Sequence, residues 1–130
     1  MDKKLLEVLQ KVQKEMPVIG RDTQAFKYKY APLDTVWDKI SKVIIENGFV
    51  VIHESTETGL KTIALHEFGE LSSFIKYSSD DLKAQEKGSE ITYFKRYNIT
   101  AIFNVIIADE DDDGYLATHK DTKEDKKLLR

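Results

Sequence analysis

The chain has 130 residues, a formal net charge of −3 and no cysteine. This length suits one domain with a sizeable core, while the lack of cysteine excludes disulfides and thiolate metal sites and favours the cytoplasm. Five of the acids lie together at residues 109–113, so the other 18 acids and 20 bases leave a net charge of +2. Nucleic-acid binding would therefore need a local basic stripe rather than a general positive field.

The termini and the apolar runs give no sign of a membrane protein. The N-terminal residues return to charge at once, and the longest apolar run, residues 101–108, is interrupted by Asn104. Neither a signal peptide nor a membrane span is expected.

Two helices are predicted in the first third of the chain. Apolar residues at helical spacing predict a helix over 2–16, with Asp2 as its N-cap and Pro17 after its end. A second helix is predicted over 32–47, because Pro32 suits a first helical position and Gly48 a helix end. Its buried face is predicted to hold Leu33, Val36, Trp37, Ile40 and Ile44.

Three short strands are predicted next, within residues 49–78. Runs of β-branched and aromatic residues at 49–55, 60–67 and 70–78 are separated by short turn sequences, which indicates an antiparallel three-stranded β-meander. The middle run alternates, and one face is more apolar than the other, as expected for a sheet covered by helices on one side. The predicted class is therefore α+β.

The second half of the chain is predicted to contain a long helix. Residues 79–87 are polar and predicted to form a loop, and the helix is predicted over 89–107, beginning near Ser89. Residues 1–114 then form the principal domain, and residues 115–130 a polar helix or tail.

Enzyme motifs are absent from the sequence. There is no phosphate-binding loop, so ATP hydrolysis is not expected. His53, His66 and His119 lie far apart in sequence; the first two could meet across the first hairpin, where a surface pair is a better interpretation than a metal site. No catalytic residue and no cofactor are expected.

The first candidate binding segment alternates aromatic and basic residues. Phe26 is followed by Lys27, Tyr28, Lys29 and Tyr30, a composition typical of single-strand binding surfaces, where rings stack on bases and ammonium groups hold phosphates. The alternative is that Tyr28 and Tyr30 fill the core beside the second helix.

The second candidate is a basic pair within the predicted long helix. Lys95 and Arg96 lie between aromatic residues, and as helical neighbours they point about 100° apart, so they can flank a groove and contact successive phosphates. The alternative is an ordinary solvated face. Lys61 and Lys76, on the predicted strands, are candidates for the opposite wall.

The acidic run resembles half of a calcium loop. Asp109, Asp111 and Asp113 have the required spacing before Gly114, but Lys120 stands where the bidentate glutamate belongs. A weak Mg²⁺ or Mn²⁺ site that includes Asp111 and Asp113 is one interpretation. The other is a solvating acidic turn that meets a basic patch on a neighbouring subunit.

Two motifs together carry a family resemblance. The pattern Y-x-Y-A-x-L spans residues 28–33, and G-S-x-I-T-Y-x-[KR]-R-Y spans residues 88–97, followed by E-D-D-D-G at 110–114. Over about residues 26–114 the chain resembles the ERF (essential recombination function) family of phage single-strand DNA-annealing proteins.

The resemblance implies ATP-independent binding of single-stranded DNA and annealing of complementary strands in phage or prophage homologous recombination, in the cytoplasm of a bacterial host. It implies a homo-oligomer, either a ring or a filament, and a fold like that of the annealing-mediator superfamily. In that fold a long helix packs across the sheet, and Lys95 and Arg96 correspond to a basic pair that lines the DNA groove.

Other functions remain open at the level of sequence. The principal alternative is a protein-interaction or regulatory module of the same fold, with the acidic run as its contact, and a metal-dependent nuclease is more distant. The sequence leaves open the size of the oligomer, the number of nucleotides bound and whether a host single-strand-binding protein is a partner.

Overall fold

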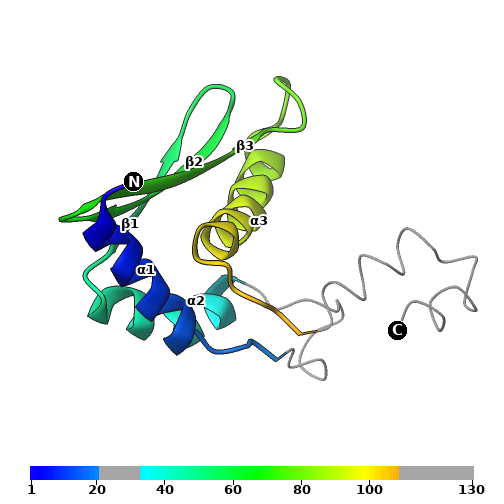
Figure 1. Cartoon of the computed structure of the whole chain (residues 1–130). Helices are drawn as coiled ribbons and strands as arrows, with labels where there is room; N and C mark the ends of the chain where they lie inside the picture. The colour runs from blue at the N-terminus through cyan, green and yellow to red at the C-terminus, as the bar shows by residue number, and fades with distance from the viewer. Residues whose placement is uncertain (21–32, 109–130) are drawn as a thin grey trace, which may run out of the picture. The chain divides into compact units, whose positions relative to one another are not determined.

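The computed structural model describes residues 1–20 and 33–108. The chain divides into two compact units, Met1–Pro17 with Pro32–Val105, and Val18–Ala31 with Ile106–Arg130. The first unit contains the helices and strands of the described residues in the order α1, α2, β1, β2, β3, α3 (Figure 1). The predicted α+β class, with a three-stranded antiparallel meander, a long helix packed on it and N-terminal helices, is confirmed.

Helices α1 and α2 begin and end close to the predicted residues. Helix α1 spans Lys3–Glu15, and the Asp2 carboxylate caps it by accepting a 2.6 Å hydrogen bond from the Lys4 N–H. Helix α2 spans Leu33–Glu46 and buries Val36, Ile40 and Ile44, which lie four residues apart on one face. A turn follows Glu46, and in it Gly48 has a φ of 89°, in the left-handed region that favours glycine.

The sheet is a meander in which β2 is the central strand. Strands β1 (Val50–Ser55), β2 (Gly59–His66) and β3 (Gly69–Lys76) pair antiparallel, with His53 opposite Thr62 and Thr62 opposite Ser73. Gly59 is required at the start of β2, because a Cβ there would lie 2.2 Å from the carbonyl oxygen of Ile75. The two faces of β2 differ sharply in burial.

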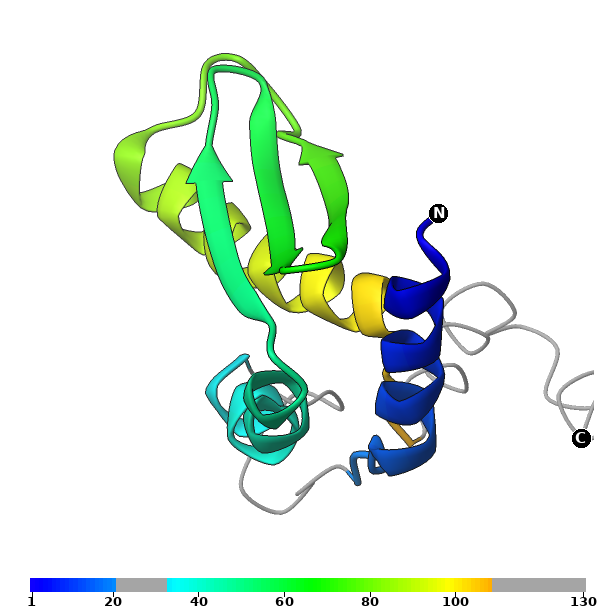
Figure 2. The same cartoon turned by 60° about the vertical axis from the view of Figure 1, so that its left-hand side comes forward.

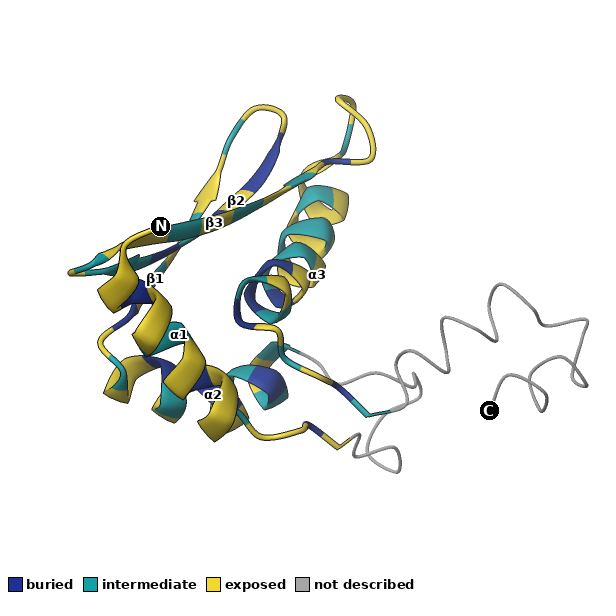
Figure 3. Ribbon diagram, in the orientation of Figure 1, coloured by how far each residue is buried: buried dark blue, intermediate teal, exposed yellow. Residues whose placement is uncertain are grey.

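One face of β2 is buried under α3 and the other is not. Leu60, Thr62 and Ala64 are at most 1% exposed, whereas Ile63 and Leu65, which point to the opposite face, are only partly buried. Figure 2 shows α3 crossing behind the three strands, and Figure 3 shows buried residues where α3 faces them. The helix therefore covers the face that carries the polar threonine, so side-chain hydrophobicity alone does not identify the covered face.

Helix α3 begins and ends earlier than predicted. It spans Ala84–Phe103, so the predicted loop over residues 79–87 contains its first turn and Gly88 lies inside it. Glu86 explains the earlier start, because its carboxylate accepts a 3.1 Å hydrogen bond from the N–H of the N-cap residue Lys83. The helix ends at Asn104, whose left-handed backbone (φ 52°, ψ 45°) stops it before the predicted residue 107.

The described part of the second unit is a short parallel contact that the sequence did not predict. The Ile19 N–H donates to the Ile106 carbonyl over 2.9 Å, and the Ala108 N–H donates to the Ile19 carbonyl over 2.7 Å. Both Ile19 and Ile107 are buried. Among the described residues, no helix is long and apolar enough to cross a bilayer.

Candidate nucleic-acid interface

Helix α3 places Lys95 and Arg96 in different surroundings. Lys95 is partly buried and lines a cavity, whereas Arg96 is 2% exposed. The guanidinium carbon of Arg96 lies 4.4 Å from the centroid of the Tyr97 ring, the distance of a cation–π contact. Of this pair, Lys95 therefore presents its side chain to the cavity, and Arg96 contributes to packing.

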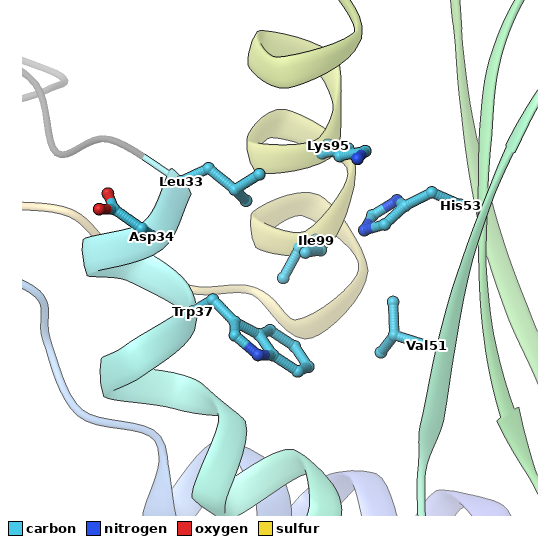
Figure 4. A pocket seen from close by; sticks show the side chains of 7 residues that line it. All are labelled: Leu33, Asp34, Trp37, Val51, His53, Lys95 and Ile99. Atoms are coloured by element: carbon cyan, nitrogen blue, oxygen red, sulfur yellow. The ribbon is translucent and has the colours of Figure 1, made fainter.

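The cavity at Lys95 lies between α2, β1 and α3 and has a volume of about 350 Å³ (Figure 4). Its walls are largely apolar, with Trp37 from α2, Val51 from β1 and Ile99 from α3. The residues that line it are Leu33, Asp34, Trp37, Val51, His53, Lys95 and Ile99. All of them belong to the first unit.

The charges around the cavity are unbalanced in favour of an anion. The side chains of Lys95 and His53 point toward one another, whereas the Asp34 carboxylate points away from both (Figure 4). That carboxylate accepts a 2.8 Å hydrogen bond from the Thr35 N–H at the start of α2. The ammonium of Lys95 is therefore the charged group of the lining that faces the interior.

His53 is held in place by a chain of hydrogen bonds that crosses the sheet beneath α3. The Ser73 hydroxyl donates to Asn98 Oδ1 over 2.9 Å, and Asn98 Nδ2 donates to Thr62 Oγ1 over 3.0 Å and to the Leu60 carbonyl over 3.2 Å. Thr62 Oγ1 lies 2.8 Å from His53 Nδ1. Asn98 already donates to the Thr62 oxygen, and when the Thr62 hydroxyl donates its proton to His53 Nδ1, a neutral imidazole carries its own proton on Nε2.

His53 is also disposed to remain neutral. Burial lowers the pKa of its imidazole below the ordinary value of 6.5, and the positive charge of Lys95 lowers that pKa further. A neutral imidazole with its proton on Nε2 offers one hydrogen-bond donor beside the ammonium. Together the two groups suit a phosphate oxygen.

The other predicted basic residues are separated from Lys95 by the sheet. In the strand register, Lys61 lies opposite Glu54 and Phe74, and Lys76 lies opposite Gly59. Both lysines therefore lie on the face of the sheet turned away from α3. They are exposed, but they do not form the wall opposite Lys95. That wall consists of Trp37 on α2 and of Val51 and His53 on β1.

Several predicted residues lie outside the described ranges. Lys27, Tyr28, Lys29 and Tyr30 are among them, as are Asp111 and Asp113. Within residues 1–20 and 33–108, no group of three or more His, Asp or Glu side chains is placed to hold a metal ion.

The expected meeting of His53 and His66 has a definite outcome in the structure, whereas His119 lies outside the described residues. His66 does not meet His53. In the strand register, His53 on β1 lies opposite Thr62 on β2, and His66 on β2 lies opposite Gly69 on β3. His66 Nε2 instead donates to the Asn47 carbonyl over 2.9 Å, and its Nδ1 accepts from the Phe68 N–H over 3.1 Å. His66 therefore connects the end of α2 to the β2–β3 turn.

Trp37 and His53 are the site residues that sequence reasoning missed. Trp37 reads as an ordinary member of the apolar face of α2, and His53 was considered only as a partner of His66. The available signal was the period of two that places His53 on the same face of β1 as Val51. That signal could not reveal which face meets α3.

The fold and the cavity together describe the class of domain to which this chain belongs. The described residues form an α+β domain in which a largely apolar cavity, with Lys95 in its lining, lies between α2, β1 and α3. A family comparison then identifies the chain as a member of the ERF superfamily, matched over residues 5–128, nearly its whole length. No match was found among curated proteins or among solved structures.

Proposed function

We propose that this protein binds single-stranded DNA and anneals complementary strands without ATP, in phage or prophage homologous recombination. The observation that carries the proposal is membership of the ERF superfamily over residues 5–128, a family that implies single-strand annealing. On this proposal the protein acts in the cytoplasm of a bacterial host.

The site supports binding without sequence preference. Lys95 and His53 offer charge and one hydrogen-bond donor, and Trp37 offers a flat apolar surface. Such groups hold a phosphate and an unpaired base, but they do not provide the paired donors and acceptors that read a base edge. Base pairing with a second strand would then decide which strands remain together.

A homo-oligomer is part of the same proposal. The face of the sheet away from α3 exposes Val50 (59%), Ile52 (43%) and Phe74 (49%). An exposed apolar face of this kind commonly marks a protein contact. Contact between copies would repeat the Lys95 site along a strand, which a chain with a net charge of −3 needs if it is to hold DNA.

The test is retention of a fluorescent single-stranded oligonucleotide across a salt series, with a duplex of the same sequence as comparison. We expect tighter binding of the single strand, little dependence on its sequence, and affinity that falls steeply with salt. Size-exclusion chromatography with and without the oligonucleotide then reports self-association. Equal affinity for duplex, or binding insensitive to salt, would contradict the proposal and favour a protein-interaction module of the same fold.

A further inference from the structure

The cavity under α3 combines two kinds of surface that a single ligand must satisfy. Its walls are mostly apolar and include Trp37, Val51 and Ile99, while Lys95 and His53 provide a positive charge and a hydrogen-bond donor at one side. A purely apolar ligand would leave the Lys95 ammonium desolvated and unpaired, which is costly. An inorganic anion would leave the apolar walls uncovered.

A ligand with a flat ring joined to an anionic group fits both surfaces. The volume of about 350 Å³ lies near the small end of the roughly 300–1,000 Å³ range of ligand pockets. Unpaired bases stack on aromatic side chains regardless of sequence, because every base has a π-face. A nucleotide carries such a ring and a phosphate on the same sugar.

We propose that the cavity takes one unpaired nucleotide, with its base against Trp37 and its phosphate at Lys95 and His53. This inference rests on the proposed function and adds to it a means of choosing single strands. A base within a duplex cannot enter the cavity unless it leaves its stack and its partner, which costs a few kcal/mol. The cavity therefore rejects duplex DNA without reading its sequence.

The position of the site gives this nucleotide a particular role. The base in the cavity is withheld from pairing, while the neighbouring bases of the strand stay outside and can pair. The cavity thus anchors the strand at one nucleotide in each subunit and leaves the remainder free for a complementary strand. Full annealing requires the anchored base to leave.

Trp37 is the chain's single tryptophan, so tryptophan fluorescence, excited at wavelengths that the six tyrosines do not absorb, reports on the cavity. The experiment titrates the full chain with an oligonucleotide and with an abasic strand of the same length and charge. We expect the strand with bases to quench Trp37, and the abasic strand to bind more weakly and to leave the emission unchanged. Quenching of equal size by both strands would overturn the inference.

Substitutions test the same contact through affinity. Trp37→Ala should weaken binding of the base-containing strand by about 5- to 150-fold and remove the preference over the abasic strand. Trp37→Phe keeps a stacking ring and should retain most of the preference for the base-containing strand. This variant replaces Trp37→Ala in the test if the alanine variant fails to fold. Phe68→Ala is the matched control, since Phe68 is a partly buried ring in the β2–β3 turn outside the cavity.

The outcomes separate this inference from the proposed function. One outcome is that the strand binds in a salt-sensitive way while Trp37 emission stays unchanged and both Trp37→Phe and Trp37→Ala keep the preference for bases. That result would support the proposed function and overturn the cavity site. If no strand binds, the proposed function fails, and deoxyadenosine monophosphate is titrated against inorganic phosphate. Quenching by the nucleotide alone would support the cavity as a site for a free nucleotide, and no quenching would overturn it.

Discussion

The two faces of the sheet contrast in a way that reverses simple expectation. The face under α3 buries Thr62 and the side chain of Asn98 that reaches it, whereas the opposite face leaves Ile52 and Phe74 exposed. The buried polar groups are satisfied by one another, so their burial carries little penalty. The difference teaches that α3 selects its face by hydrogen-bond complementarity as well as by apolar area, and that the opposite face keeps exposed apolar side chains.

The largest expected effect comes from breaking the polar side of this contrast. Asn98→Ala removes the partner of Thr62, of Ser73 and of the Leu60 carbonyl at once, and should lower the free energy of unfolding by about 3 kcal/mol. Urea denaturation measures it. Phe74→Ser, on the exposed face, is the control and should cost less than about 1 kcal/mol. Equal losses for the two variants would show that the hydrogen-bonded chain contributes nothing special.

The next effect separates the two basic neighbours on α3. Arg96→Met should lower the free energy of unfolding by about 2 kcal/mol, because Arg96 is buried against Tyr97. Lys95→Met should leave stability nearly unchanged and weaken single-strand binding by about tenfold, as expected for one charged contact. Thermal melts and a binding titration on both variants check this. Exchanged outcomes would mean that Arg96, not Lys95, meets the strand.

A change on the exposed face should act on association rather than on folding. Ile52→Lys should weaken self-association by about tenfold, since it places a charge where apolar area is expected to be covered. Sedimentation at several protein concentrations measures the effect. Ile45→Lys on α2 is the matched control, because that isoleucine is similarly exposed. If both variants associate alike, the sheet face is not the contact.

The smallest effect is a pH dependence at His53. Burial and Lys95 lower the pKa of His53 in the folded chain, so the unfolded chain binds the proton first as the pH falls below about 6.5. The free energy of unfolding therefore decreases as the pH falls, by at most about 1.4 kcal/mol per pH unit. Lys95 on α3 faces the imidazole, Thr62 and Asn98 beside it are uncharged, and Asp34 on α2 points away. Lys95→Met should therefore raise the His53 pKa, which an NMR titration of its ring carbons records. An unchanged pKa would show that burial alone lowers it.

Much of the fold follows from local sequence signals. Asp2, Pro17 and Gly48 mark helix ends through capping and backbone chemistry that acts within a few residues, and short turn sequences imply the order of the meander. The two family motifs likewise lie in the sequence and identify the superfamily. The start of α3 was less predictable. Gly88 resembles a helix boundary in the sequence, but the hydrogen bond from the Lys83 N–H to the Glu86 carboxylate stabilises the turn before it.

The candidate site depended on contacts between residues distant in sequence. Trp37, His53 and Lys95 come from three elements, and period-two alternation places His53 on a face without saying which face α3 will cover. The tertiary structure decides that, because Asn98 can satisfy Thr62 and Ser73 only on one side of the sheet. The same packing separates Lys61 and Lys76 from Lys95 and buries Arg96, since neighbouring residues on a helix point in different directions.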